Sequence, residues 1–111
     1  MEIQFKTDKL RKSCTDAKVM IKTHGPERAK ILRRRLDQLL AAPTLAVMRG
    51  LPGKCHGLSG DQNGTLAIAL DGPYRLIFEP AVNPPPQLAD GGLDWQEVTA
   101  VRVLEVENYH D

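Results

Sequence analysis

Four polar side chains in the second half of the chain have the residue types of an acid–base site. His56 precedes a glycine-rich loop, Arg75 stands in an otherwise apolar stretch, and Tyr109 and His110 lie next to the C-terminal residue. Strand ends and the loops beside them often meet at one end or one face of a sheet. We therefore expect these four side chains to converge.

Their chemistry matches RNA cleavage without a metal ion or another cofactor. A base must take the proton of the ribose 2′-OH, a cation must stabilise the phosphorane, and an acid must protonate the leaving 5′ oxygen. Histidine suits either proton transfer because its ordinary pKa is about 6.5. Arginine suits the phosphate because its planar guanidinium binds two oxygens at once. His56, His110, Arg75 and Tyr109 are a sufficient set.

Each of these residues also has a purely structural explanation. His56 would serve as a turn cap, Tyr109 as a packed aromatic of the last strand, and His110 lies near an end that frays. Arg75 is the hardest to explain in this way, because a partly buried guanidinium needs acceptors or a charged ligand. Residue types alone leave both explanations open.

The two cysteines do not indicate a nucleophile, a disulfide framework or a zinc site. Cys55 adjoins His56, but neighbouring strand residues point to opposite faces, which favours a buried thiol. His24, just before a Gly-Pro pair, is interpreted as a loop residue. No apolar run approaches the roughly 20 residues of a membrane span, and residues 1–12 do not resemble a signal peptide. We expect a cytoplasmic protein without membrane contact.

Charge is distributed unevenly although the net charge is only +1. Residues 1–56 contain 13 basic and five acidic residues, whereas residues 57–111 contain two and nine. The basic half would attract a polyanion, or the two halves would partly neutralise each other in the fold. The candidate RNA-binding residues are Lys9, Arg11, Lys12, Arg33, Arg34, Arg35 and Lys54.

The first half of the chain is predicted to be mainly helical. Residues 2–6 alternate as a short strand, Thr7 or Asp8 caps a short helix reaching about Cys14, and residues 18–22 form a turn or helix end. Pro26 suits a first helical position, and Pro43 ends the helix that follows. Residues 44–50 form another short helix. One face of the main helix is predicted to carry Ala29, Leu32, Leu36, Leu39 and Leu40.

The second half is predicted to be sheet. Residues 65–70 alternate, with Leu66, Ile68 and Leu70 on one side, and residues 71–73 form the turn of a hairpin that returns over residues 74–78. Residues 83–94 form a long loop. In the last strand, residues 98–106, Val101, Val103 and Glu105 are expected opposite Arg102, Leu104 and Val106. The order of elements predicts one α+β domain over residues 1–111, with the N-terminal strand and helices packed on one face of a small antiparallel sheet.

Three stretches together resemble a known family. Residues 51–64 (LPGKCHGLSGDQNG), 70–80 (LDGPYRLIFEP) and 98–110 (VTAVRVLEVENYH) are similar to the plasmid-maintenance killer proteins, the HigB-type toxins of the RelE/ParE superfamily. The similarity covers essentially the whole chain. It implies a compact RelE-like fold and cleavage of messenger RNA in the ribosomal A site, by attack of the 2′-OH on the adjacent phosphate.

By matching position, the resemblance implies roles for five residues. His56 and His110 would transfer protons, Arg75 would hold the scissile phosphate, Tyr109 would orient the substrate, and Lys54 would be a further phosphate contact. The partner would be a helix-turn-helix antitoxin of the HigA type, and operator DNA would be contacted only through it. The basic helices would contact ribosomal RNA, form a solvated face, or receive an acidic antitoxin.

The chain departs from the family pattern where several members carry basic residues. Ser59 replaces a lysine, Gln62 and Asn63 follow the Gly-Asp, and Asp71 stands where some members have an arginine. Removing one stabilising donor can cost about 10²–10³ in rate. Two alternatives therefore stay open beside the ribonuclease: a toxin that inhibits a protein such as DNA gyrase, and a catalytically weak member that acts as a transcriptional co-regulator with its antitoxin.

Overall fold

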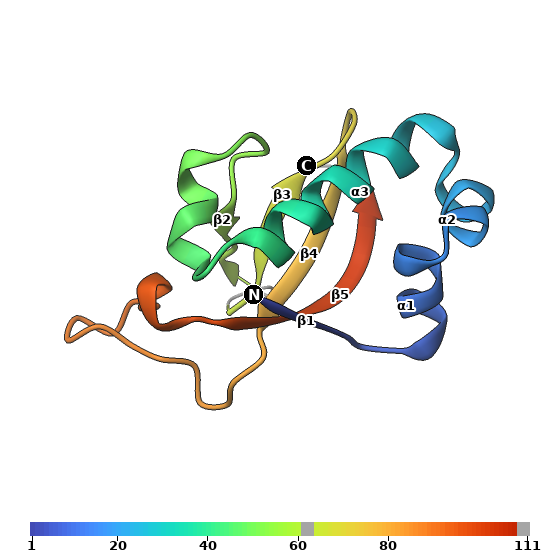
Figure 1. Cartoon of the computed structure of the whole chain (residues 1–111). Helices are drawn as coiled ribbons and strands as arrows, with labels where there is room; N and C mark the ends of the chain where they lie inside the picture. The colour runs from blue at the N-terminus through green and yellow to red at the C-terminus, as the bar shows by residue number, and fades with distance from the viewer. Residues whose placement is uncertain (61–63, 109–111) are drawn as a thin grey trace.

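The helices α1, α2 and α3 follow the first strand and lie on one side of a sheet (Figure 1). The computed structural model describes residues 1–60 and 64–108. No helix in these ranges is long and apolar enough to span a membrane. The elements in chain order are β1 (Glu2–Phe5), α1 (Asp8–Thr15), α2 (Ala17–His24), α3 (Pro26–Ala41), the 3-10 helix η1 (Leu45–Gly50), β2 (His56–Gly57), β3 (Leu66–Ala69), β4 (Tyr74–Pro80), the 3-10 helix η3 (Trp95–Glu97) and β5 (Ala100–Asn108).

The five strands form one sheet in the order β1-β5-β4-β3-β2. The pairs β5–β4 and β4–β3 are antiparallel, as expected. β2, a two-residue strand that the sequence did not predict, pairs antiparallel with β3. β1 joins the sheet as an edge strand and runs parallel to β5, with Ile3 opposite Val101. The expected α+β class is thus confirmed, and the first strand belongs to the sheet itself rather than to the layer packed on it. A parallel pair needs a long crossover, which the three helices provide.

The three helices begin and end at recognisable signals. The Thr7 hydroxyl accepts from the backbone N–H of Leu10 and caps α1, as predicted. Asp16 then caps a complete second helix, α2, where the sequence predicted only a turn or helix end. Gly25 ends α2 with φ +83°, and Pro26 starts α3. His24 therefore lies in the last turn of α2, and its interpretation as a loop residue was wrong.

The apolar face of α3 packs on the sheet and forms the core with it. Leu32 and Leu39 are fully buried against strand residues such as Phe78. Leu40 was expected on this face, but 58% of its surface is exposed. Successive helix residues are rotated by about 100°, so the residue after a fully inward leucine turns towards solvent.

A β-bulge in β5 changes the predicted alternation of the last strand. Ile77 lies opposite Glu105 but Phe78 lies opposite Val103, so Leu104 is an extra residue on β5. Val106 consequently packs against the core together with Val101 and Val103, whereas the alternation had placed it on the other face. Glu105 is exposed.

The half-buried imidazole of His24 predicts that stability depends on pH. Burial lowers the pKa of His24, and the nearby charge of Arg28 lowers it further. Because the unfolded chain then binds the proton more readily, stability should fall as the pH drops below about 6.5, the ordinary value for histidine. Urea unfolding at several pH values below about 6.5 gives the free energy of unfolding as a function of pH. The slope of this dependence should be smaller in His24→Gln than in the wild type. An equal slope in the two proteins would show that His24 is not the source of the pH dependence.

Candidate active site

The side chain of His56 has a defined tautomer at the edge of the sheet. Its Nδ1 lies 2.7 Å from the backbone oxygen of Lys54. A carbonyl oxygen can only accept, so Nδ1 carries the proton and Nε2 of the neutral ring is left as a base. Lys54 adopts φ +50°, a conformation uncommon for a lysine, and this places its carbonyl beside the ring. His56 itself is exposed.

Arg75 lies near the start of β4, just after the hairpin turn, and is half-buried. Its Nη1 donates to the backbone oxygens of Gly72 and Tyr74, each at 2.9 Å. These bonds use the two hydrogens of Nη1. The Nε–Nη2 edge of the guanidinium is therefore the part that would pair with two oxygens of a phosphate.

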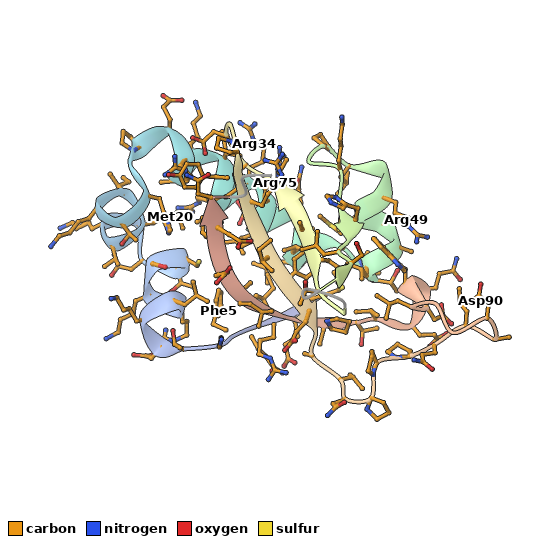
Figure 2. All side chains as sticks on the ribbon, turned by 180° about the vertical axis from the view of Figure 1, so that it is seen from behind. Phe5, Met20, Arg34, Arg49, Arg75 and Asp90 are labelled. Carbon is orange, nitrogen blue, oxygen red and sulfur yellow. The ribbon has the colours of Figure 1, made fainter. Side chains whose placement is uncertain are left out.

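His56 and Arg75 project from the same face of the sheet, the face opposite the helices, on which Ala67 and Ile77 are buried. Directly paired residues share a face, and His56 pairs with Ala67, which pairs with Ile77. Arg75 is two residues from Ile77 on β4 and therefore points the same way. The backbones of His56 and Arg75 are separated by two strand spacings across the sheet and by two residues along the strands, which together make about 12 Å. Both side chains can therefore reach one ribose-phosphate unit. Figure 2 views the molecule from behind, on this side, and labels Arg75.

The turn before Arg75 is bound by an arginine that sequence reasoning did not select. The Arg28 guanidinium of α3 makes a two-bond ion pair with the Asp71 carboxylate, with Nε 2.9 Å from Oδ1 and Nη2 3.2 Å from Oδ2. The same guanidinium stacks over the ring of Tyr74, 3.3 Å from its centroid. Helical spacing could have identified Arg28 and Arg35 as inward-facing residues. They lie four residues before and three residues after the buried Leu32, on the same face of α3.

Comparison with known proteins addresses the fold. No family model and no curated protein sequence matches the chain. Among solved structures, the chain is similar to the YoeB/ParE toxin from Agrobacterium tumefaciens, with a TM-score of 0.59 at 14% identity over 100% of both chains. The chain has the fold of a YoeB/ParE toxin. At this identity the similarity describes the architecture and does not extend to activity.

Two of the four predicted catalytic residues can be placed in this YoeB/ParE fold. His56 and Arg75 share the face opposite the helices, whereas Tyr109 and His110 lie outside the described residues. Asn108, the last described residue before them, pairs with Tyr74 next to Arg75. Of the family departures, Gln62 and Asn63 also lie outside the described residues. Asp71 is the ion-pair partner of Arg28, and Ser59 is exposed.

The predicted RNA-binding cations are dispersed over the fold. Lys54, next to β2, is exposed and adjoins His56. Lys9, Arg11 and Lys12 are exposed on α1, which packs against β1 at the opposite edge of the sheet. Asp8 lies within ion-pair distance of Arg11 and Lys12, and its hydrogen bond with Arg11 lowers the pKa of the carboxyl.

The three consecutive arginines of α3 differ in their surroundings. Arg33 and Arg34 are exposed, whereas Arg35 turns inward and its Nε donates to the backbone oxygen of Ala69 at 3.0 Å. Gly53 permits this approach, because a Cβ at that position would lie 3.0 Å from the Arg35 Nε and 2.6 Å from a methyl of Ile68. Arg35 thus ties the loop before β2 and the end of β3 to α3.

Arg35 is therefore expected to contribute to stability, in contrast to its neighbour. Arg35→Ala removes a charged hydrogen bond and should lower the free energy of unfolding by roughly 1–3 kcal/mol. Arg34→Ala, one residue away and exposed, should change it by less than about 0.5 kcal/mol. Chemical unfolding of the two variants measures the difference, and equal effects would show that the Arg35 contact carries no net stability.

Cys55 is buried and points into the core beside β2, as the sequence predicted. Burial raises the pKa of its thiol to about 12. The pKa of Cys14, also buried, is raised for the same reason. Because the thiolate is the reactive form, neither sulfur is a nucleophile at neutral pH.

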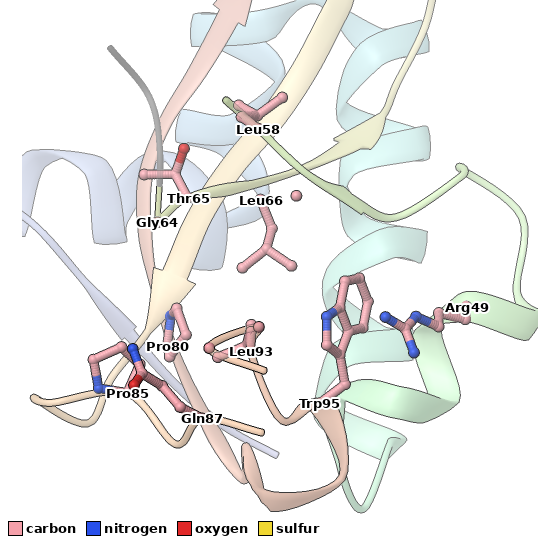
Figure 3. Close-up of a pocket in the computed structure, with 13 residues that line it drawn as sticks. Arg49, Leu58, Gly64, Thr65, Leu66, Pro80, Pro85, Gln87, Leu93 and Trp95 are labelled. Atoms are coloured by element: carbon pink, nitrogen blue, oxygen red, sulfur yellow. The ribbon is translucent and has the colours of Figure 1, made fainter. Parts of the chain in front are cut away.

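A groove of about 470 Å³ opens away from the His56–Arg75 face (Figure 3). It is lined by Leu66 and Pro80 of the hairpin and by the long loop before η3. At its side the guanidinium of Arg49 stacks on the ring of Trp95, 3.9 Å from the centroid. Leu66 alternates with Ala67, so the groove lies on the helix side of the sheet. None of the residues that line this groove was predicted from the sequence to be a site residue.

Proposed function

We propose that this protein is the toxin of a toxin–antitoxin pair and that it cleaves messenger RNA on the ribosome. The single observation that carries the proposal is the placement of His56 and Arg75 on one face, opposite the helices, with the His56 Nε2 left as a base. A protein that only binds and inhibits a target needs neither arrangement. The YoeB/ParE fold supports the toxin part of the proposal.

The reaction is an attack of a ribose 2′-OH on its own 3′ phosphate. One histidine accepts the 2′-OH proton while the new oxygen–phosphorus bond forms, and the other donates a proton to the 5′ oxygen as its bond to phosphorus breaks. His56 is one of this pair, and His110 is the proposed second member. The Nε–Nη2 edge of Arg75 stabilises the charge on the phosphorane. The products are a 2′,3′-cyclic phosphate and a 5′-hydroxyl.

The remaining residues contribute to binding. Tyr109 orients the substrate, and Lys54 contacts a phosphate beside His56. The exposed cations Lys9, Arg33 and Arg34 contact ribosomal RNA. The toxin works in the cytoplasm, and a helix-turn-helix antitoxin of the HigA type restrains it and mediates any contact with operator DNA.

Induction in growing bacteria tests the proposal, with new 5′ ends mapped on messages. Wild-type protein should arrest growth and cut within codons, and both effects should disappear in Arg75→Ala and His110→Ala. Lys22→Ala removes an exposed cation of α2 and serves as the control that keeps wild-type activity. Growth arrest with intact messages would replace the ribonuclease with a protein-inhibiting toxin. No arrest at all would favour a co-regulator.

A further inference from the structure

The hairpin turn between β3 and β4 is bound on its helix side by one guanidinium. Arg28 forms the two-bond ion pair with Asp71 and stacks on Tyr74, and its Nη1 also donates to the backbone oxygen of His24 at 3.3 Å. The arginine and aspartate side chains are only 21% and 34% exposed, compared with 50% and 66% for the surface pair of Arg11 and Asp8. Low exposure and two-bond geometry limit the motion of the pair.

The same turn holds Arg75 from its other side. The backbone N–H of Tyr74 donates to the backbone oxygen of Asp71 at 2.9 Å, and this hydrogen bond closes the turn. The oxygens of Gly72 and Tyr74 then accept from Nη1 of Arg75. A continuous series of contacts therefore leads from Arg28, through Asp71 and Tyr74, to the Arg75 guanidinium on the face opposite the helices.

We propose that Arg28 is a positioning residue that sets the orientation of Arg75. The inference rests on the proposed function, in which the Nε–Nη2 edge of Arg75 binds the scissile phosphate. β4 is paired on both sides within the sheet, but residues 71–73 of the turn lie beyond the last paired residues, Ala69 and Tyr74. A turn that extends past the paired strands opens locally more readily than the sheet itself. Without Arg28 the turn carbonyls shift, and Arg75 loses the two contacts that orient it. Arg28 itself does not touch the substrate, because Tyr74 points to the helix side of the sheet.

Nuclear magnetic resonance of the full chain tests the positioning without any activity. In Arg28→Ala, the Nε–H signal of Arg75 and the amide signals of Gly72, Tyr74 and Arg75 should shift and broaden. Glu79→Ala is the matched control, because it breaks another ion pair of the same strand, in which Arg102 Nε lies 2.8 Å from the Glu79 carboxylate. That control should leave the Arg75 signals in place.

Cleavage kinetics on ribosome-bound message then test the consequence, at a temperature where all variants are folded by circular dichroism. Arg28→Ala should lower kcat about 10- to 100-fold with little change in KM, since small displacements of a catalytic group cost this much. Arg28→Lys should restore little, because an ammonium cannot make the two-bond pair. In an Arg75→Ala background, Arg28→Ala should have no further effect.

Two results would overturn the inference: Arg75 signals that stay unchanged in Arg28→Ala, or losses that multiply in the double variant as independent effects do. Wild-type protein that cleaves no message would overturn the proposed function instead. In that case the resonance experiment still decides whether Arg28 positions Arg75.

Discussion

Arg75→Ala is expected to lower the rate of message cleavage about 10²- to 10³-fold, the usual loss when one donor to a developing charge is removed. Arg75 lies on the same face as His56, and the backbone oxygens of Gly72 and Tyr74 hold its guanidinium in place. The measurement is single-turnover cleavage of a message bound to ribosomes.

Arg75→Lys sharpens this prediction. A lysine keeps the positive charge but cannot hold two phosphate oxygens with one planar group, so it should recover only part of the rate. Thermal melting provides the control, because two surface hydrogen bonds contribute only about 1 kcal/mol each and both variants should remain folded. Wild-type cleavage by Arg75→Ala would move the phosphate site away from β4.

The largest effect on stability is expected from Leu39, with its neighbour Leu40 as the matched control. Leu39 is 0% exposed and belongs to the core, whereas Leu40 is 58% exposed. Leu39→Ala should lower the free energy of unfolding by roughly 2–5 kcal/mol, because it removes buried contacts and leaves a cavity. That is a large part of the roughly 5–15 kcal/mol that stabilises a typical domain.

Leu40→Ala should change the free energy of unfolding by less than about 0.5 kcal/mol, since alanine is at least as good a helix former and no buried contact is lost. Urea unfolding of both variants gives the comparison within one helix turn. Similar losses at the two positions would mean that the α3 face is rotated relative to the described packing.

Local patterns determined much of the fold. The α3 helix has its start at Pro26 and its buried leucines where helical spacing predicts them, and the hairpin turns at Asp71 as its Gly and Pro predict. The burial of Cys55 also followed from strand alternation. These features depend on residues that are close neighbours in the sequence, so the local sequence contains the information that they require.

Tertiary structure decided the features that depend on distant partners. The parallel pairing of β1 with β5 joins Ile3 to Val101, almost a hundred residues further along the chain. The bulge at Leu104 that turns Val106 inward arises from the register of β5 against β4. In the same way, the sequence shows Asp71 only as a position where some members of the family have an arginine. The structure shows that Asp71 pairs with Arg28, 43 residues earlier in the chain. Side-chain partners at such separations are set by packing, and local spacing carries no record of them.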